Sequence, residues 1–181
     1  MPEEIEIPTE HLHEEIQEKA GEQKEKWTLY LALSTALMAV MAAVAGLLAG
    51  HHANEALIER VKASDQWNFY QSKNLKQEIA INTDQILHAM GKTDTAAKDH
   101  SADIARYEKE KADIRKGAEE DERKSVAHLD KHVPLASAVT AFQIAIAISA
   151  IAILTRRKSL WFGSLILTAV GIVFLILGLL S

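Results

Sequence analysis

The stretch "WTLYLALSTALMAVMAAVAGLLAG", residues 27–50, contains no Asp, Glu, Lys, Arg or His across its 24 positions. Residues 133–155 and 159–181 are equally free of charge, over 23 positions each. At a rise of about 1.5 Å per residue, each stretch forms a helix of about 34 Å, long enough for a hydrocarbon core of about 30 Å. Only a helix satisfies its own backbone hydrogen bonds in lipid. The sequence therefore predicts three transmembrane helices.

The residues before the first span argue against a cleaved signal peptide. Residues 1–26 carry nine acidic residues and three lysines, whereas a signal peptide begins with a basic region. The apolar stretch also exceeds the roughly 7–15 apolar residues of a signal peptide. The first span is therefore predicted to stay in the chain, behind an acidic cytoplasmic tail. Cysteine is absent, which excludes disulfides and thiolate metal sites.

The loop between the second and third spans predicts the orientation in the membrane. Residues 156–158 are three basic residues, and short basic loops stay in the cytoplasm. Aromatic rings favour that interface, and four of them would lie there: Trp27, Tyr30, Trp161 and Phe162. The N-terminus is then cytoplasmic and residues 51–132 are external. That segment has 14 basic and 16 acidic residues and is too long for its charges to oppose this orientation.

The segment between the first two spans, residues 51–132, contains no proline and is predicted to be helical. Its apolar residues recur mostly three or four positions apart, which is typical of amphipathic helices. They are Leu57, Val61, Leu75, Ile79, Ile86 and Met90, followed by Ile104, Tyr107, Ile114, Ala118, Val126 and Leu129. Gly91 separates the two series and suits the residue after a helix end. We therefore predict an all-α integral membrane protein. A long, coiled-coil-like helical hairpin lies outside the membrane, and its first arm continues the first span without a break.

The apolar stripe of this hairpin is thin. Polar residues interrupt it at Ser64, Gln71, Asn74, Lys111 and Asp121. Because helices depend on tertiary packing for most of their stability, such a hairpin is marginal alone. It is predicted to pack against copies of itself or against a partner.

Three aromatic residues in the first arm support the same prediction. Trp67 and Tyr70 are three positions apart and share a helix face, whereas Phe69 points almost the other way. Rings on two faces need two surfaces to cover them: the second arm and a neighbouring subunit. All three residues are therefore predicted to lie at an oligomer or partner interface. The simpler alternative is that one ring is exposed, since single exposed apolar residues are normal.

Three sequence elements carry a resemblance to a known family. "KASDQWNFYQSKNLK" follows an Ala- and Gly-rich span, and "RYEKEKADIRKGAEEDE" leads into a span that ends in "LTRRKSLW". Over roughly residues 27–180 the chain resembles domain of unknown function 4337, an uncharacterised bacterial family of three-pass membrane proteins. The resemblance implies a bacterial inner-membrane location. It implies no activity and no catalytic residue.

The spans themselves restrict the class of function. They hold no ionisable residue, whereas proton relays and ion-coupled transporters place such groups within the membrane. Gln143 is the one amide deep in a span. It is predicted to make an interhelix hydrogen bond or, in an oligomer, to line a pore. Small residues four apart, such as Ala39 and Ala43, predict close helix packing within or between subunits.

Four histidines flank the hairpin: His51, His52, His128 and His132. They would meet at the outer membrane surface, where imidazoles bind metals or respond to pH. No carboxylate or cysteine completes a metal motif, and histidine is also well tolerated at a membrane interface, so no metal or other cofactor is predicted. No phosphate-binding glycine loop or nucleophile elbow occurs, and we predict no enzyme activity. The net charge of −5 disfavours nucleic-acid binding.

The favoured function is a non-enzymatic, homo-oligomeric inner-membrane protein whose partners are the lipid bilayer, copies of itself or another envelope protein. The alternative is an oligomeric channel lined by the transmembrane helices. A metal- or pH-responsive membrane sensor ranks third.

Overall fold

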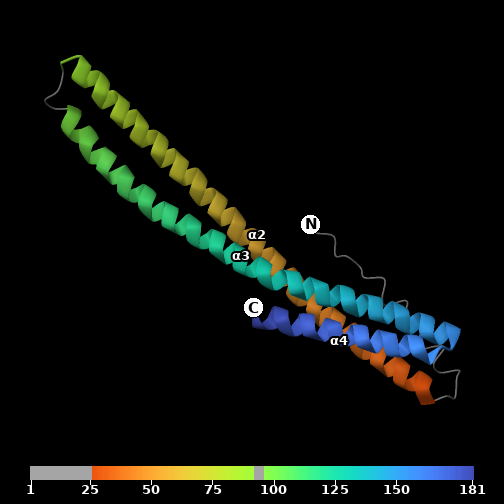
Figure 1. The fold of residues 1–181 in the computed structure, drawn as a ribbon. Helices are drawn as coiled ribbons and strands as arrows, with labels where there is room; N and C mark the ends of the chain where they lie inside the picture. The colour runs from red at the N-terminus through yellow and green to blue at the C-terminus, as the bar shows by residue number, and fades with distance from the viewer. Residues whose placement is uncertain (1–25, 92–95) are drawn as a thin grey trace. The chain divides into compact units, whose positions relative to one another are not determined.

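The computed structural model describes residues 26–91 and 96–181 and is helical almost throughout them (Figure 1). Three helices follow one another in the order α2 (Lys26–Ala89), α3 (Ala96–Thr155) and α4 (Lys158–Leu180). The acidic tail predicted for residues 1–26 lies outside the described residues, except for Lys26.

Helix α2 runs for 64 residues without interruption, which confirms that the first apolar stretch continues into the charged segment after it. It stops where the sequence predicts. The Met90 amide donates to the Ile86 carbonyl at 3.0 Å, and the Gly91 amide donates to the His88 carbonyl at 3.1 Å. Gly91 has a φ of 69°, a left-handed conformation in which a Cβ is unfavourable, so glycine is the residue suited to this helix end.

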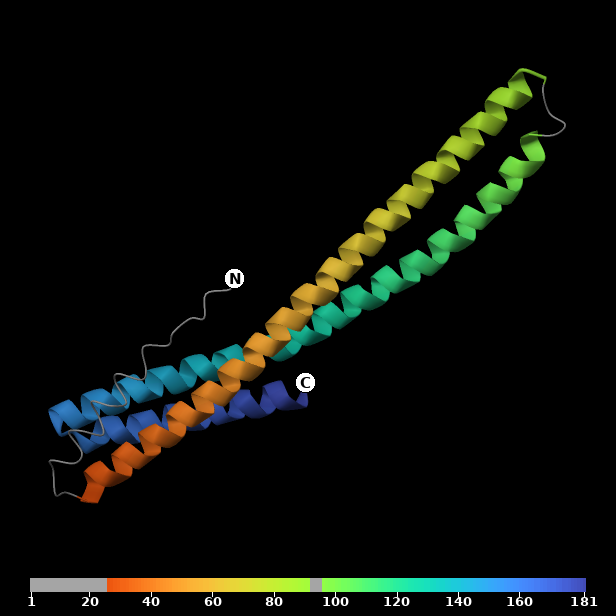
Figure 2. The same cartoon turned by 180° about the vertical axis from the view of Figure 1, so that it is seen from behind.

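Helix α3 is 60 residues long and continues through Pro134. A tight turn joins it to α4, with the Arg156 amide donating to the Ile153 carbonyl and the Arg157 amide to the Ala152 carbonyl, each at 3.2 Å. Arg156 adopts a positive φ of 53° there. This turn contains Arg156 and Arg157, whereas Lys158, the third basic residue of the predicted loop, begins α4. The turn makes α3 and α4 antiparallel neighbours (Figure 2).

Each of the three helices contains a stretch long and apolar enough to cross a membrane. The apolar stretch of α2 lies near the N-terminus, and that of α4 fills the helix. The described residues divide into two compact units. The first comprises the chain up to Ala53 and from Leu129 onward, and we call it the three-helix bundle. The second is Asn54–His128, and we call it the helix pair.

Small residues and a few large side chains form the core of the three-helix bundle. Its three clusters of buried residues centre on Leu31, Phe142 and Met38, with alanines of α2 and α3 around them. A polar contact inside the bundle joins α3 to α4: the Ser149 hydroxyl donates to Ser164 Oγ at 2.9 Å, and both residues are fully buried. Such hydrogen bonds add to helix association where water is absent.

Two glycines of α4 allow the closest approach in the bundle. A Cβ added at Gly171 would lie 2.8 Å from the Phe142 ring, and one at Gly178 would lie 2.6 Å from Leu135 Cγ. At Gly163, by contrast, an added Cβ meets nothing within 4 Å. Gly171 and Gly178 therefore pack closely against α3 within the chain.

Candidate interaction surface

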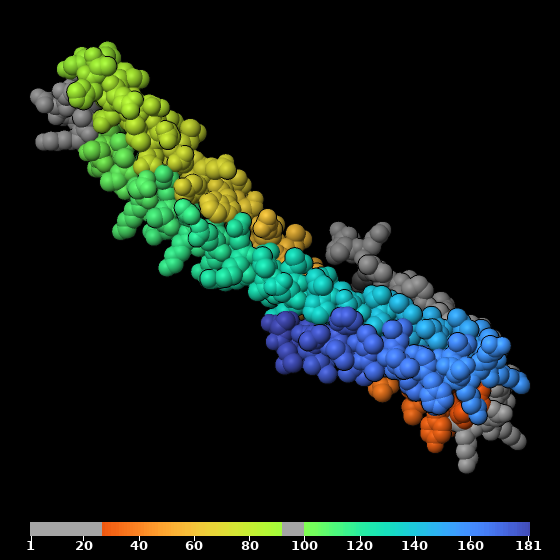
Figure 3. Space-filling view, in the orientation of Figure 1, coloured from red at the N-terminus to blue at the C-terminus, as the bar shows by residue number. Residues whose placement is uncertain are grey.

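In the helix pair, residues 54–89 of α2 run antiparallel to residues 96–128 of α3, and the two segments lie side by side (Figure 3). The buried apolar residues between the two segments are alanines: Ala56, Ala63, Ala80 and Ala118, none more than 8% exposed. A methyl group buries little apolar area, so this seam gains only a small hydrophobic stabilisation. It does allow the two helix backbones to approach closely.

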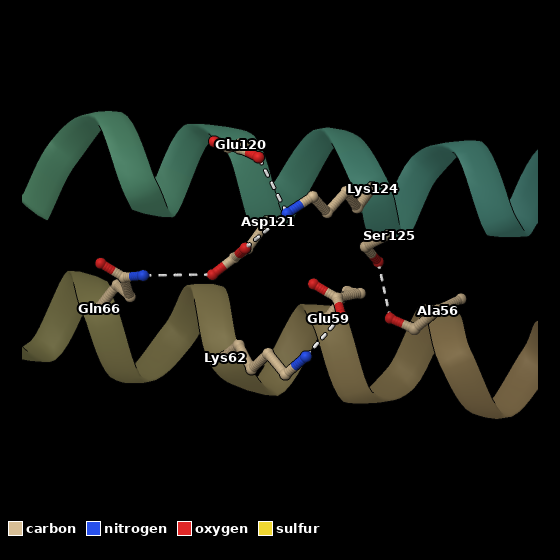
Figure 4. A network of polar contacts seen from close by, with 8 residues as sticks. All are labelled: Ala56, Glu59, Lys62, Gln66, Glu120, Asp121, Lys124 and Ser125. Carbon is tan, nitrogen blue, oxygen red and sulfur yellow. Dashed lines mark hydrogen bonds and ion pairs between the residues drawn. The ribbon is translucent and has the colours of Figure 1, made fainter.

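Polar side chains occupy the remaining seam positions. Four are buried, at no more than 9% exposure: Glu59, Gln77, Lys111 and Ser125. Buried polar groups are expected to have hydrogen-bond partners, and each of these has one. Figure 4 shows one end of the seam, where the Ser125 hydroxyl donates to the Ala56 carbonyl at 2.8 Å and the Gln66 amide donates to Asp121 at 3.2 Å.

The contacts continue along the seam. The Gln77 amide donates to Glu108 at 2.8 Å, Lys111 donates to Asn74 at 3.0 Å, and Lys73 pairs with Glu110 at 2.6 Å. Such contacts have fixed donor and acceptor positions, so they specify the register of the two segments more strongly than alanine packing does.

These contacts favour the charged form of the seam carboxylates. Hydrogen bonding from Gln77, and then from Lys111, lowers the pKa of Glu108 below its ordinary value. The hydrogen bond from Lys73 likewise lowers the pKa of Glu110. At neutral pH the seam is therefore charged and held by opposite charges, whereas a hydrophobic seam would be neutral.

The large apolar residues of α2 lie on the opposite side, and this corrects the expectation drawn from their spacing. The sequence suggested that they form the core of a hairpin. Four of them are instead exposed: Val61 (53%), Leu75 (62%), Ile79 (56%) and Ile86 (60%). Together with Ile58 (46%), which was not in the predicted series, they form an exposed line that we call the outer stripe. The reason is that the small and polar residues on the other face of α2 form the seam with α3. The outer stripe is thus an exposed apolar line on the described part of the helix pair.

Comparison with known protein families matches residues 27–181 to a domain of unknown function, DUF4337. The chain belongs to the DUF4337 family. No curated protein and no solved structure matches it. The DUF4337 domain therefore includes all three helices, and both the seam and the outer stripe lie within it.

The three aromatic residues of the DUF4337 domain have two different environments. Trp67 and Tyr70 are partly buried and contact each other edge to face, with ring centroids 5.6 Å apart. The Lys111 ammonium lies 5.7 Å from the Tyr70 ring. Phe69 is 53% exposed, and the Lys73 ammonium lies 5.2 Å from the centroid of its ring. Phe69 therefore lies beside the outer stripe and is available to a partner, and an interface role for all three residues stays a prediction.

Gln143 lies in the apolar stretch of α3 and is partly buried in the three-helix bundle. Its side chain makes no hydrogen bond to any other described residue. The structure therefore does not provide the interhelix hydrogen bond within one chain. The amide has unused donors and an acceptor, which either a second copy or water would satisfy.

The histidines are placed individually. Within the three-helix bundle, His132 Nδ1 lies 2.8 Å from the Ala49 carbonyl oxygen. When Nδ1 carries a proton, it donates a hydrogen bond to this oxygen. His51 and His52 have tilted rings with centroids 5.3 Å apart. Among the described residues, no group of three or more His, Asp or Glu side chains is arranged to hold a metal ion.

Proposed function

We propose that this DUF4337 chain is an integral membrane protein that assembles with copies of itself through the outer stripe. In the proposed arrangement the three apolar stretches cross a bacterial inner membrane, and the helix pair is a coiled-coil-like hairpin on the external side. The basic turn at residues 156–158 supports this orientation, because short basic loops stay in the cytoplasm. The proposed role is interaction and structure, without enzymatic chemistry.

The polarity of the helix pair carries this proposal. Exposed apolar residues on the transmembrane stretches need no partner, because lipid covers them. The outer stripe lies in a charged segment outside those stretches, where water would contact it. Exposed apolar surface of this kind marks an interaction site in soluble segments.

The free energy gained by burying the outer stripe is sufficient for assembly. Fully burying a large apolar side chain gains about 1.5–3 kcal/mol, and the outer stripe is already about half buried. Two copies would thus gain on the order of 10 kcal/mol from ten side chains. Association costs about 4–15 kcal/mol, and the cost falls when both copies are confined to one membrane. The outer stripe can therefore support a stable complex.

Removing the apolar character of the outer stripe tests the proposal. In the triple variant Leu75→Gln, Ile79→Gln and Ile86→Gln, we expect the subunit count to fall to one, while helix content stays unchanged because glutamine is a good helix former. Native mass spectrometry of the full chain from mild detergent measures the count. A wild-type protein that is already monomeric would contradict self-assembly and indicate a different protein as the partner.

The matched control changes three exposed residues on the other segment of the helix pair: Lys109→Gln, Asp113→Asn and Lys116→Gln. These positions lie away from the outer stripe, so assembly should be retained. Equal loss of subunits in the control would show that the general surface, and not the outer stripe, holds the copies together.

A channel is the second candidate, and the unpartnered amide of Gln143 favours it. If copies surround a pore lined by α3, Gln143 would face water there and hydrogen-bond to it. We then expect purified protein to conduct in planar bilayers, with conductance changed by Gln143→Leu and unaffected by Ile144→Val on the exposed neighbouring position. Absence of any conductance from wild-type protein would reject this candidate.

A further inference from the structure

Three asparagines of α2 repeat at an interval of fourteen residues: Asn54, Asn68 and Asn82. All three are exposed, and none makes a side-chain hydrogen bond to another residue that the structure describes. Fourteen residues are two heptads, the repeat of a left-handed coiled coil. The asparagines therefore recur at one position of a seven-residue pattern.

The outer stripe has the same repeat and the same phase. Val61 and Leu75 fall at the asparagine position of the intervening heptads, and Ile58, Ile79 and Ile86 fall at the second core position, four residues after an asparagine-position residue. These steps of four and three residues define ten core positions from 54 to 86, of which five are aliphatic, three are asparagine, and the other two are Asp65 and Ser72. One face of α2 thus has aliphatic residues in phase with a coiled-coil repeat on both sides of a polar stretch at residues 65–72, while the opposite face forms the seam with α3.

In the sequence this spacing also continues back into the apolar stretch of α2. Exposed residues occupy the corresponding positions there: Leu33, Leu37, Val40, Val44 and Leu47. Aliphatic residues at these positions can pack in lipid as they do in water, although lipid gives them no hydrophobic driving force. The repeat is therefore a property of α2 and not only of its charged part.

We propose that the partner of the outer stripe is α2 of a second copy, lying parallel and in register. This inference rests on the self-assembly proposed above and specifies its geometry. Two copies that cross one bilayer in the same orientation place equal residues at equal heights, so a parallel, in-register pairing is imposed. Asn54, Asn68 and Asn82 then each face the same residue of the other copy, where one amide donates and the other accepts.

The asparagines act against other alignments. A shift of one heptad places each asparagine opposite Val61, Leu75 or the residue at 47 or 89, which leaves its amide unpaired in an apolar layer. Asparagine in a coiled-coil core specifies register and subunit number at some cost in stability. Asp65 and Ser72 occupy two polar layers of the pair, and the Asp65 layer is the weakest because two carboxylates of like charge would face each other there. Assembly is therefore specific and reversible rather than maximally stable.

The chain contains no cysteine, so single cysteines report the pairing directly. In full-length protein in liposomes, mild oxidation should link two copies through Val61→Cys, Asn68→Cys and Leu75→Cys. Controls are Arg60→Cys and His88→Cys, which are exposed but lie well around the helix from the outer stripe. We expect disulfide dimers to form at least about tenfold faster at positions 61, 68 and 75, because only at these core positions can two Cα atoms approach within disulfide range.

The outcomes separate this inference from the proposed function. Several subunits by native mass spectrometry, with equal linking at Arg60→Cys and Val61→Cys, would overturn the α2 pairing and leave self-assembly intact. A monomer without stripe linking would overturn both. A second variant, Asn68→Leu with Asn82→Leu, should assemble at least as tightly as wild type and broaden the distribution of subunit numbers. An unchanged single subunit number in that variant would show that the asparagines do not specify the pairing.

Discussion

Gly178→Ala is expected to lower the stability of the three-helix bundle by about 1–3 kcal/mol, the usual cost of overpacking a core. The added Cβ would lie 2.6 Å from Leu135 Cγ and 3.2 Å from the Leu135 backbone nitrogen. Leu135 is fully buried, and a backbone atom cannot rotate away. The helices must therefore separate or Leu135 must leave its rotamer. Unfolding of the full chain by denaturing detergent in mixed micelles measures the loss.

Gly163→Ala is the matched control on the same helix. Nothing lies within 4 Å of its added Cβ, and alanine is the better helix former by roughly 0.5–1 kcal/mol. Its stability should equal or slightly exceed that of wild type. If both variants lost the same stability, the loss would come from glycine flexibility in α4, and the close contact with Leu135 would not be its cause.

The sequence was sufficient to predict the features set by single residues or by uninterrupted composition. Three stretches free of charge predict three apolar helices, and the structure has them. Gly91 predicts a helix end, and its positive φ confirms it. The glycines at 171 and 178 are small enough for close contact, but only the fold shows that Phe142 and Leu135 are the side chains that fill the space.

The inside and outside of the helix pair could not be predicted in the same way. Periodicity shows which residues share a face, but it does not show which face meets the neighbouring helix. Helix α2 has two periodic faces, one of alanine and polar residues and one of large apolar residues. A rule based on hydrophobicity selects the second as the core. The structure selects the first, because Gln66, Gln77 and Lys111 find hydrogen-bond partners across it.

This choice of face is physically consistent with an assembling protein. A seam that is held by hydrogen bonds between fixed donors and acceptors keeps its register when an apolar partner binds or dissociates. The partner binds the outer stripe, so it does not compete for the surface that forms the seam. An apolar seam would instead leave a polar outer face and a self-sufficient helix pair. Within the bundle, Gln143 likewise leaves a surface group for another partner, since its amide makes no hydrogen bond to a described residue.

Ala118→Leu tests whether close approach in the seam is essential. Ala118 is fully buried in the seam, and an added Cβ at the adjacent Gly117 would already lie 2.7 Å from Gln66 Oε1. Three further carbon atoms therefore need space that only separation of the segments provides. Overpacking costs about 1–3 kcal/mol. Weakening the 3.2 Å hydrogen bond from Gln66 to Asp121 adds about 1.5–3 kcal/mol, because the acceptor is charged.

The expected result is faster amide hydrogen exchange along both segments of the helix pair, with exchange in the three-helix bundle unchanged. Ala112→Leu, at an exposed position of the same helix, is the control and should exchange like wild type. Slower exchange in Ala118→Leu would mean that leucine fits the seam and strengthens it. Alanine would then be dispensable there, and the polar contacts alone would decide which face of α2 meets α3.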